Sequence, residues 1–158
     1  MREILFRGKR IDNGEWVEVQ TLVVIHQDDN DLIFMPQHGE DVTADPMEGN
    51  DRALTSIYGN YYQILPQTVG QYTGLTDKNG KKIFEGDICN INIPRIDGEF
   101  STHNNCLCSF EYGKFMFSSY SDIYFCVGDG YGYHDTCNKN IEVIGNIHDN
   151  LGLLEATE

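Results

Sequence analysis

Residues 69–93, which read VGQYTGLTDKNGKKIFEGDICNINI, contain the clearest turn and strand signals of the chain. The Asn-Gly pair at 79–80 lies between two runs of β-forming residues, and such a pair readily adopts the positive φ angles of a tight hairpin turn. A second turn is predicted at 85–87. Beyond it, residues 88–93 alternate between apolar side chains and asparagine, the period of a half-buried strand that Pro94 then ends.

Two further hairpins are predicted, one on each side of this stretch. Residues 3–24 contain two β-rich runs joined at Asn13-Gly14, and LCSFEYGKFMF at 107–117 bends around Gly113. Isolated strands are predicted near Leu32, Tyr61, Tyr124 and Val143. The pattern predicts a mainly β chain of hairpins with little helix, and a partly open, SH3-like barrel in the second half.

Three stretches carry a resemblance to a known family. FRGKRIDNGEWV at 6–17, the central stretch 69–93 and IEVIGNIHDN at 141–150 occur in the order in which similar words occur in the YopX family of small bacteriophage and prophage proteins. The resemblance implies a compact β pseudo-barrel over most of the chain, and it implies no established activity. The chain departs from the family pattern at Leu151-Gly152, where relatives usually have Pro-Glu.

The chain is predicted to be a single YopX-like domain, 1–158, with a soft internal boundary near 66–67. Residues 1–66 would form an N-terminal β lobe, and 67–158 the barrel-like half. The lobe would include an acidic loop at 28–51, which holds eight acidic residues and no basic one. Residues 95–105 show no periodic pattern and are predicted to form an exposed loop.

Charge is the strongest compositional signal. Eleven Lys and Arg residues against 25 Asp and Glu residues give a formal net charge of −14. This balance opposes binding to duplex DNA, because phosphate-dominated affinity needs a surplus of cations. Solubility in a cytoplasm, an acidic surface facing a basic partner and imitation of DNA all remain compatible with the composition.

The lengths of the apolar runs bear on membrane insertion and export. The longest ones, such as 22–25 and 32–35, are far shorter than the roughly 20 residues that cross a bilayer. The N-terminus MREILFRGKR lacks the apolar block of a secretory signal. We therefore expect neither membrane association nor export, and the resemblance to a phage and prophage family then implies the host bacterial cytoplasm.

The five cysteines are an odd number without framework spacing. A zinc site could be drawn from Cys106, Cys108, Cys126, His134 and Cys137, but the paired C-x-x-C knuckles of such sites are absent from the sequence. Reduced cysteines buried in strands are the favoured interpretation. No metal and no cofactor is predicted.

Three partial motifs bear on catalysis. His134-Asp135 with Cys137 lacks a surrounding nucleophile motif, and GDGYGY at 128–133 is not followed by the helix and lysine of a phosphate loop. Asp87 at the entry to a strand is interpreted as a turn carboxylate that accepts backbone N–H groups. We therefore predict no catalytic residue, no small-molecule substrate and no enzymatic activity.

Basic and aromatic clusters receive structural interpretations. Arg2, Arg7, Lys9 and Arg10 are predicted to pair with the carboxylates of the opposite strand rather than to grip phosphate; those carboxylates are Asp12, Glu15 and Glu18. Three tyrosines are interpreted as strand residues packing on a core, with a stacking platform as the alternative: Tyr58, Tyr61 and Tyr62.

Taken with the resemblance, these features predict a phage or prophage accessory protein that acts as a non-enzymatic protein-binding module. Its partner would be a host or phage protein. A self-assembling structural component, forming a homo-oligomer through open sheet edges, is the alternative. A nucleic-acid-associated protein is the less favoured third reading.

Overall fold

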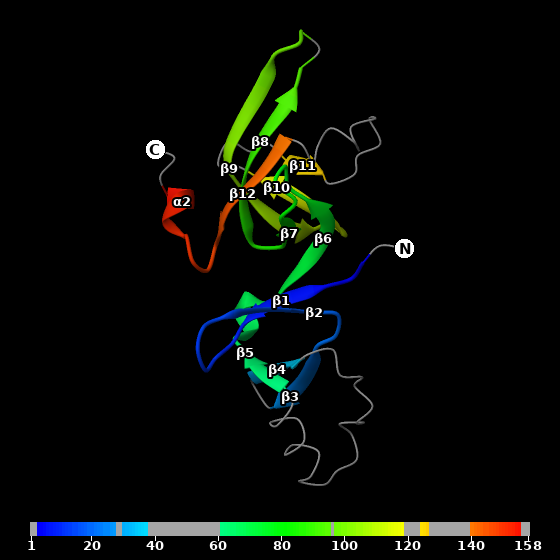
Figure 1. Cartoon of the computed structure of the whole chain (residues 1–158), viewed down its shortest axis with the longest axis vertical. Coiled ribbons are helices and arrows are strands. Elements are labelled where there is room, and N and C mark those ends of the chain that lie inside the picture. Colours follow the sequence, from blue (N-terminus) through cyan, green and yellow to red (C-terminus); the bar gives the residue numbers. More distant parts are fainter. Residues whose placement is uncertain are drawn as a thin grey trace. The chain divides into compact units, whose positions relative to one another are not determined.

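A computed structural model describes residues 3–27, 30–37, 61–95, 97–118, 124–126 and 140–155. The chain forms two compact units, one of residues Glu3–Gln71 and the other containing Tyr72–Glu158 (Figure 1). The division falls inside strand β6 (Gly70–Thr76), whereas the sequence placed a soft boundary near 66–67. Each unit is described by itself.

The N-terminal unit is built from five short strands and one turn of 3-10 helix. They are β1 (Phe6–Lys9), β2 (Trp16–Val19), β3 (Val23–Gln27), β4 (Asn30–Pro36), β5 (Tyr61–Ile64) and η1 (Pro66–Thr68). β1 and β2 form the predicted antiparallel hairpin, and β1 also pairs with the first residues of β6. β3, β4 and β5 form a separate antiparallel sheet in that order.

The core of this unit is small and depends on a close backbone approach. Phe34, Met35 and Ile64 are fully buried. Gly8 lies against two of them, because a Cβ at that position would come within 2.4 Å of Ile64 Cγ2. The Lys9 N–H also donates to Thr68 Oγ1 at 2.8 Å. Strand β1 therefore packs closely on the end of β5 and on η1.

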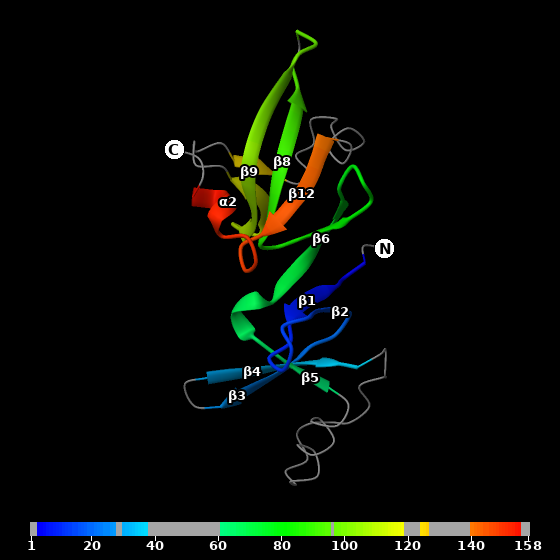
Figure 2. The ribbon, with the colours of Figure 1, turned by 60° about the vertical axis from the view of Figure 1, so that its left-hand side comes forward.

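The C-terminal unit contains the rest of β6, six further strands and one helical turn. They are β7 (Lys82–Phe84), β8 (Asp87–Pro94), β9 (Phe100–Glu111), β10 (Lys114–Ser118), β11 (Tyr124–Cys126), β12 (Ile141–Asn146) and α2 (Gly152–Glu155). Five of the strands make an antiparallel sheet in the order β11-β10-β9-β8-β12 (Figure 2). Its apolar core consists of Ile83, Cys89, Ile91, Cys106, Cys108, Phe115, Phe117, Ile141 and Val143.

The predicted mainly β architecture is confirmed. The hairpin turns at 13–14, 79–80 and 113 all form, and so do the strands near Leu32, Tyr61, Tyr124 and Val143. In the described part of the chain, helix is limited to η1 and α2, and neither is long and apolar enough to cross a membrane.

The sequence predicted a partly open, SH3-like barrel in the second half, and the described strands of this unit instead form an open sheet. β11 and β12 are the two ends of the five-strand order and are not paired with each other within the described ranges. The sheet is bent by register shifts where β8 meets β9 and β12, but it stays open. The structure thus consists of three antiparallel sheets, and none of them closes into a barrel among the described residues.

The predicted exposed loop at 95–105 is wrong in extent. β9 begins at Phe100 and pairs with β8 from Pro94 backwards, so only a short turn separates the two strands. Residues 101–104 are polar, and they alternate between half-buried and exposed without any apolar side chain. Backbone pairing and polar side-chain contacts form this part of the strand, and no hydrophobic period reveals it in the sequence.

The Gly8 contact gives a stability prediction. Gly8→Ala places a methyl group against Ile64, and we expect overpacking to lower the free energy of unfolding by about 1–3 kcal/mol. The matched control is Gly152→Ala at the start of α2, where a Cβ meets nothing within 4 Å. That variant should be neutral or slightly stabilised. Urea unfolding followed by circular dichroism measures both, and equal effects would contradict the packing argument.

Candidate functional site

Asp87, the carboxylate singled out in the sequence, is part of a turn. Its side chain is almost fully buried, and its Oδ2 accepts a hydrogen bond from the Phe84 N–H at 2.8 Å. Gly86 beside it has a φ of 83°, which favours glycine, and its N–H donates to the Cys108 carbonyl. Asp87 therefore has the predicted role of a turn carboxylate at the entry to β8.

Asp77 has a similar role, which the sequence reading did not assign. Its Oδ1 accepts the N–H groups of Asn79 and Lys81 at 2.8 and 2.9 Å, and its Oδ2 accepts the Val143 N–H at 3.1 Å. Burial raises the pKa of this carboxyl, but the backbone donors outweigh that effect and hold the pKa below its usual value. Its place just before the Asn-Gly turn was the available signal.

The central cysteines belong to the core rather than to a reactive site. Cys89, Cys106 and Cys108 are buried free thiols on β8 and β9. Burial raises the pKa of Cys106 to about 11, and it raises the pKa of Cys89 further, with Asp87 adding to the shift. The Cys89 and Cys106 thiols therefore stay protonated near neutral pH, as expected for strand cysteines.

The metal hypothesis receives no support from the described residues. No group of three or more His, Cys, Asp or Glu side chains suited to a metal ion occurs among them. The Cys126 side chain, His134, Asp135, Cys137 and the loop 128–133 lie outside the described residues. The same holds for Tyr58 and Arg2.

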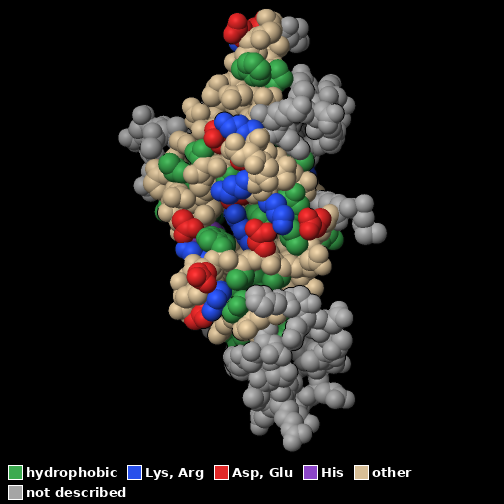
Figure 3. All heavy atoms as spheres, viewed as in Figure 1, with side chains coloured by type: hydrophobic (Ala, Val, Ile, Leu, Met, Phe, Trp, Pro, Cys, Tyr) green, Lys and Arg blue, Asp and Glu red, His purple; other side chains and the backbone are tan. Residues whose placement is uncertain are grey.

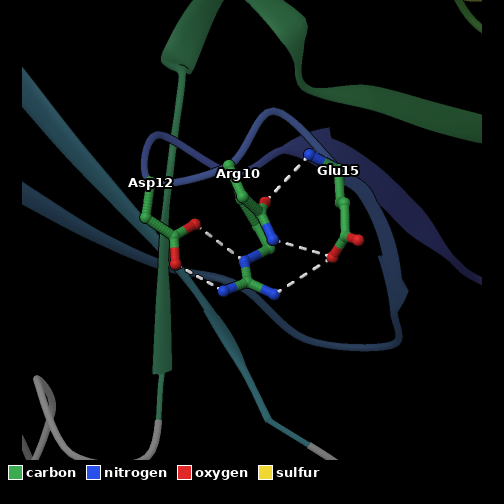
Figure 4. A network of polar contacts seen from close by, with 4 residues as sticks. Arg10, Asp12 and Glu15 are labelled. Atoms are coloured by element: carbon green, nitrogen blue, oxygen red, sulfur yellow. Dashed lines mark hydrogen bonds and ion pairs between the residues drawn. The ribbon is translucent and has the colours of Figure 1, made fainter.

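The basic residues of the first hairpin are engaged locally. Arg10 Nε donates to Asp12 Oδ1 at 2.9 Å, and its other nitrogens reach Asp12 Oδ2 and Glu15 Oε2 (Figure 4). The Arg10 guanidinium also lies 3.9 Å from the centre of the Tyr62 ring. The predicted pairing with carboxylates is thus confirmed for Arg10, and Tyr62 packs on this cation.

Trp16 engages the other two cations of this hairpin. The Arg7 guanidinium and the Lys9 ammonium lie 5.0 and 5.7 Å from the centre of its ring. In the C-terminal unit, Lys78 pairs with Glu142 at 2.7 Å. An aromatic ring or a carboxylate thus gives each of these three cations a local contact.

The most prominent surface feature is a two-stranded arm. We use this name for the end of β8 from residue 92, the start of β9 up to residue 102, and the turn residues 95 and 97–99 between them. These strand ends run on past the other strands of their sheet (Figures 1 and 2). Contacts between the strands stiffen it. The Thr102 hydroxyl donates to Asn92 Oδ1 at 2.9 Å, and the Arg95 N–H donates to the Glu99 carbonyl at 2.7 Å.

The tip of the arm combines charge with an exposed aromatic ring. Arg95 and Asp97 form an ion pair at 2.9 Å across the turn. Phe100 lies directly opposite Pro94 in the register and is 57% exposed. Figure 3 shows hydrophobic side chains next to the charged tip. The arm therefore presents an apolar surface held on a defined backbone.

The arm is not explained by packing of the core. Along β8, the apolar cluster of this unit extends only as far as Ile93, which packs against it partly buried. Beyond that residue, the side chains of 97–100 are all exposed. The tip of this hairpin therefore adds little buried area to the core and leaves the Phe100 ring in solvent.

Comparison with known proteins identifies the family. The model of the family described as YopX protein matches residues 5–155. The chain belongs to the YopX protein family. No curated protein matches it. Among solved structures it is similar to protein EF1440 from Enterococcus faecalis, at 24% identity and a TM-score of 0.48, covering 96% of this chain and 97% of that one.

In this member of the YopX family, the family-like stretches build the fold. Residues 6–17 form the β1–β2 hairpin, and 69–93 contain both turn carboxylates. In 141–150, the Asn146 side chain accepts the N–H groups of His148 and Asp149 at 2.9 and 3.0 Å. These residues are explained by turns and strand ends. The arm tip lies within the 5–155 match but outside these three stretches.

The lowered pKa of Asp77 gives a pH prediction. Because the folded-state pKa lies below the ordinary 3.8, the ionised carboxylate stabilises the fold fully above that value, and the effect is lost as pH falls through the folded-state pKa. Asp77→Asn should therefore lower the free energy of unfolding by about 1–3 kcal/mol near neutral pH. Urea unfolding of both proteins should show this gap narrowing below pH 3.8.

The matched control for this prediction is Asp97→Asn. Asp97 also accepts a backbone N–H in a turn, that of Glu99 at 3.1 Å, but it is exposed. Its replacement should change stability little. If the difference in free energy of unfolding between the native protein and Asp77→Asn stayed constant with pH, the stabilising role of the Asp77 negative charge would be contradicted.

Proposed function

We propose that this YopX-family protein is a non-enzymatic binding module whose arm inserts Phe100 into an apolar pocket of a partner protein. The chain resembles a family of bacteriophage and prophage proteins. This resemblance supports a host or phage protein as the partner and the bacterial cytoplasm as the place where they bind. The net charge of −14 supports a partner other than duplex DNA.

The observation that carries the proposal is the exposure of Phe100 on a stiff backbone. Aromatic residues are enriched among the few side chains that dominate binding energy. A hairpin already ordered by the Asn92–Thr102 and Arg95–Asp97 contacts loses little further conformational freedom when it binds. The arm thus has the chemistry and the preorganisation of a binding element.

The non-enzymatic part of the proposal is supported by the roles of the reactive residue types. Asp77 and Asp87 accept backbone N–H groups in turns, and the thiols of β8 and β9 are buried in a core. A catalytic carboxylate or thiol needs access to a substrate and a pKa suited to proton transfer or attack. These groups serve the fold instead.

Site-specific photocrosslinking tests the proposal in the bacterium that encodes the protein. A photoreactive phenylalanine analogue replaces Phe100 in one strain and Tyr112 in a matched strain. Tyr112 is a suitable control because it is aromatic and 90% exposed. It follows the last residue of β9, whereas Phe100 is the first residue of that strand. We expect a discrete product with one other protein from position 100 and none from position 112.

Binding measurements with purified protein then test whether Phe100 supplies the binding energy. Phe100→Ser should abolish capture of the crosslinked partner while leaving the urea unfolding midpoint unchanged, because Phe100 buries little surface. Crosslinking only to a second copy would favour the self-assembling alternative. Equal products from both positions, or undiminished capture by Phe100→Ser, would overturn the role of the arm.

A further inference from the structure

Two sheet edges of this protein are closed by hydrogen bonds from neighbouring segments. On β5, the Gln63 carbonyl accepts the Ile11 N–H at 3.0 Å, and Leu65 just after the strand donates to the Lys9 carbonyl at 2.8 Å. On β12, the Val143 N–H donates to Asp77, and the Ile141 carbonyl accepts the Lys78 N–H at 2.9 Å. Closed edges of this kind do not pair with further strands.

Strand β3 has a different character. Within the described ranges it pairs with β4 alone, over five consecutive positions and without a register shift. Its sequence VVIHQ contains none of the lysines, prolines or bulges that natural proteins place on edge strands to prevent further pairing. Every second residue of such an edge turns its N–H and C=O away from its neighbour.

The side chains and charge along β3 indicate what would pair with it. Val24 is 39% exposed, so one side of the strand presents an apolar contact. Near the β3–β4 connection, His26 Nδ1 lies 2.7 Å from Asp31 Oδ1, and both side chains are exposed. This end of the β3–β4 pair therefore carries the exposed carboxylate of Asp31, in a chain of net charge −14.

We propose that β3 binds an extended, lysine- or arginine-bearing segment of a partner protein as an added strand. Backbone hydrogen bonds to β3 supply the affinity, and apolar residues at alternate positions of the segment contact Val24. A basic residue of the segment meets the acidic end near Asp31. A second copy of this chain fits the edge less well, because it brings another net charge of −14.

This inference adds a second surface, in the N-terminal unit, to the proposed protein-binding function. It does not depend on the arm, which belongs to the other unit. The two can therefore fail separately. Loss of crosslinking at Phe100 would leave strand addition at β3 untouched, and the reverse also holds.

Hydrogen exchange of the full chain with short synthetic peptides tests the proposal. The probe is a peptide of alternating lysine and valine. One matched peptide has glutamate in place of lysine, and another keeps lysine and valine but carries N-methyl groups on alternate backbone amides. We expect the first peptide to slow amide exchange within residues 23–27 and the other two to have no effect. The N-methylated peptide keeps its charge, so it separates strand addition from general attraction to an acidic protein.

Variants at the edge complete the test. Val24→Lys should weaken binding of the lysine-valine peptide at least about tenfold, since a lysine protects an edge and repels the probe. Val24→Thr keeps the β-branched shape and the backbone edge, so it should weaken binding far less than Val24→Lys does. Phe100→Ser should bind the peptide as the native protein does. Equal protection of residues 23–27 by the lysine-valine peptide and by its N-methylated form would overturn the proposal. So would protection confined to other strands, or protection of β3 that grows with protein concentration when no peptide is present.

Discussion

The buried carboxylate of Asp77 is the contact on which the C-terminal unit depends most. It closes the β6–β7 turn through two backbone N–H groups, and through the Val143 N–H it fixes a strand that lies 66 residues further along the chain. A charged acceptor is costly to bury, and that cost is offset only when several donors converge on it. The same contact covers the edge of β12. One side chain thus joins a local turn to the order of the strands in the sheet.

The sequence predicted the structural parts that follow from local chemistry. The Asn-Gly turns at 13–14 and 79–80 appeared because positive φ at a glycine is a property of the residue itself. Asp87 was correctly interpreted because a carboxylate beside a turn commonly accepts backbone N–H groups, which is also a local property. The contact of Asp77 with Val143 was not predictable, because it depends on how β12 comes to lie beside the turn. Nothing in either segment alone encodes that pairing.

Two missed features share one physical cause. The first residues of β9 are polar and gain their order from backbone pairing with β8, so they leave no hydrophobic period in the sequence. β3 was hidden in a continuous run of apolar residues at 22–25, which does not show where one strand ends and another begins. Both are places where a strand is defined mainly by its neighbour. The start of β9 also belongs to the arm, and β3 is the edge strand proposed above to bind a partner.

The two proposed surfaces would recognise partners by different physics. Insertion of Phe100 depends on the shape of an apolar pocket, so its specificity lies in side-chain packing and in exclusion of water around one ring. Strand addition at β3 draws its affinity from backbone groups that every protein possesses, and only side chains at alternate positions and the charge near Asp31 discriminate among sequences. A pocket tolerates few sequences and an edge tolerates many. A protein with both could hold one particular partner through the arm while accepting varied extended segments at β3.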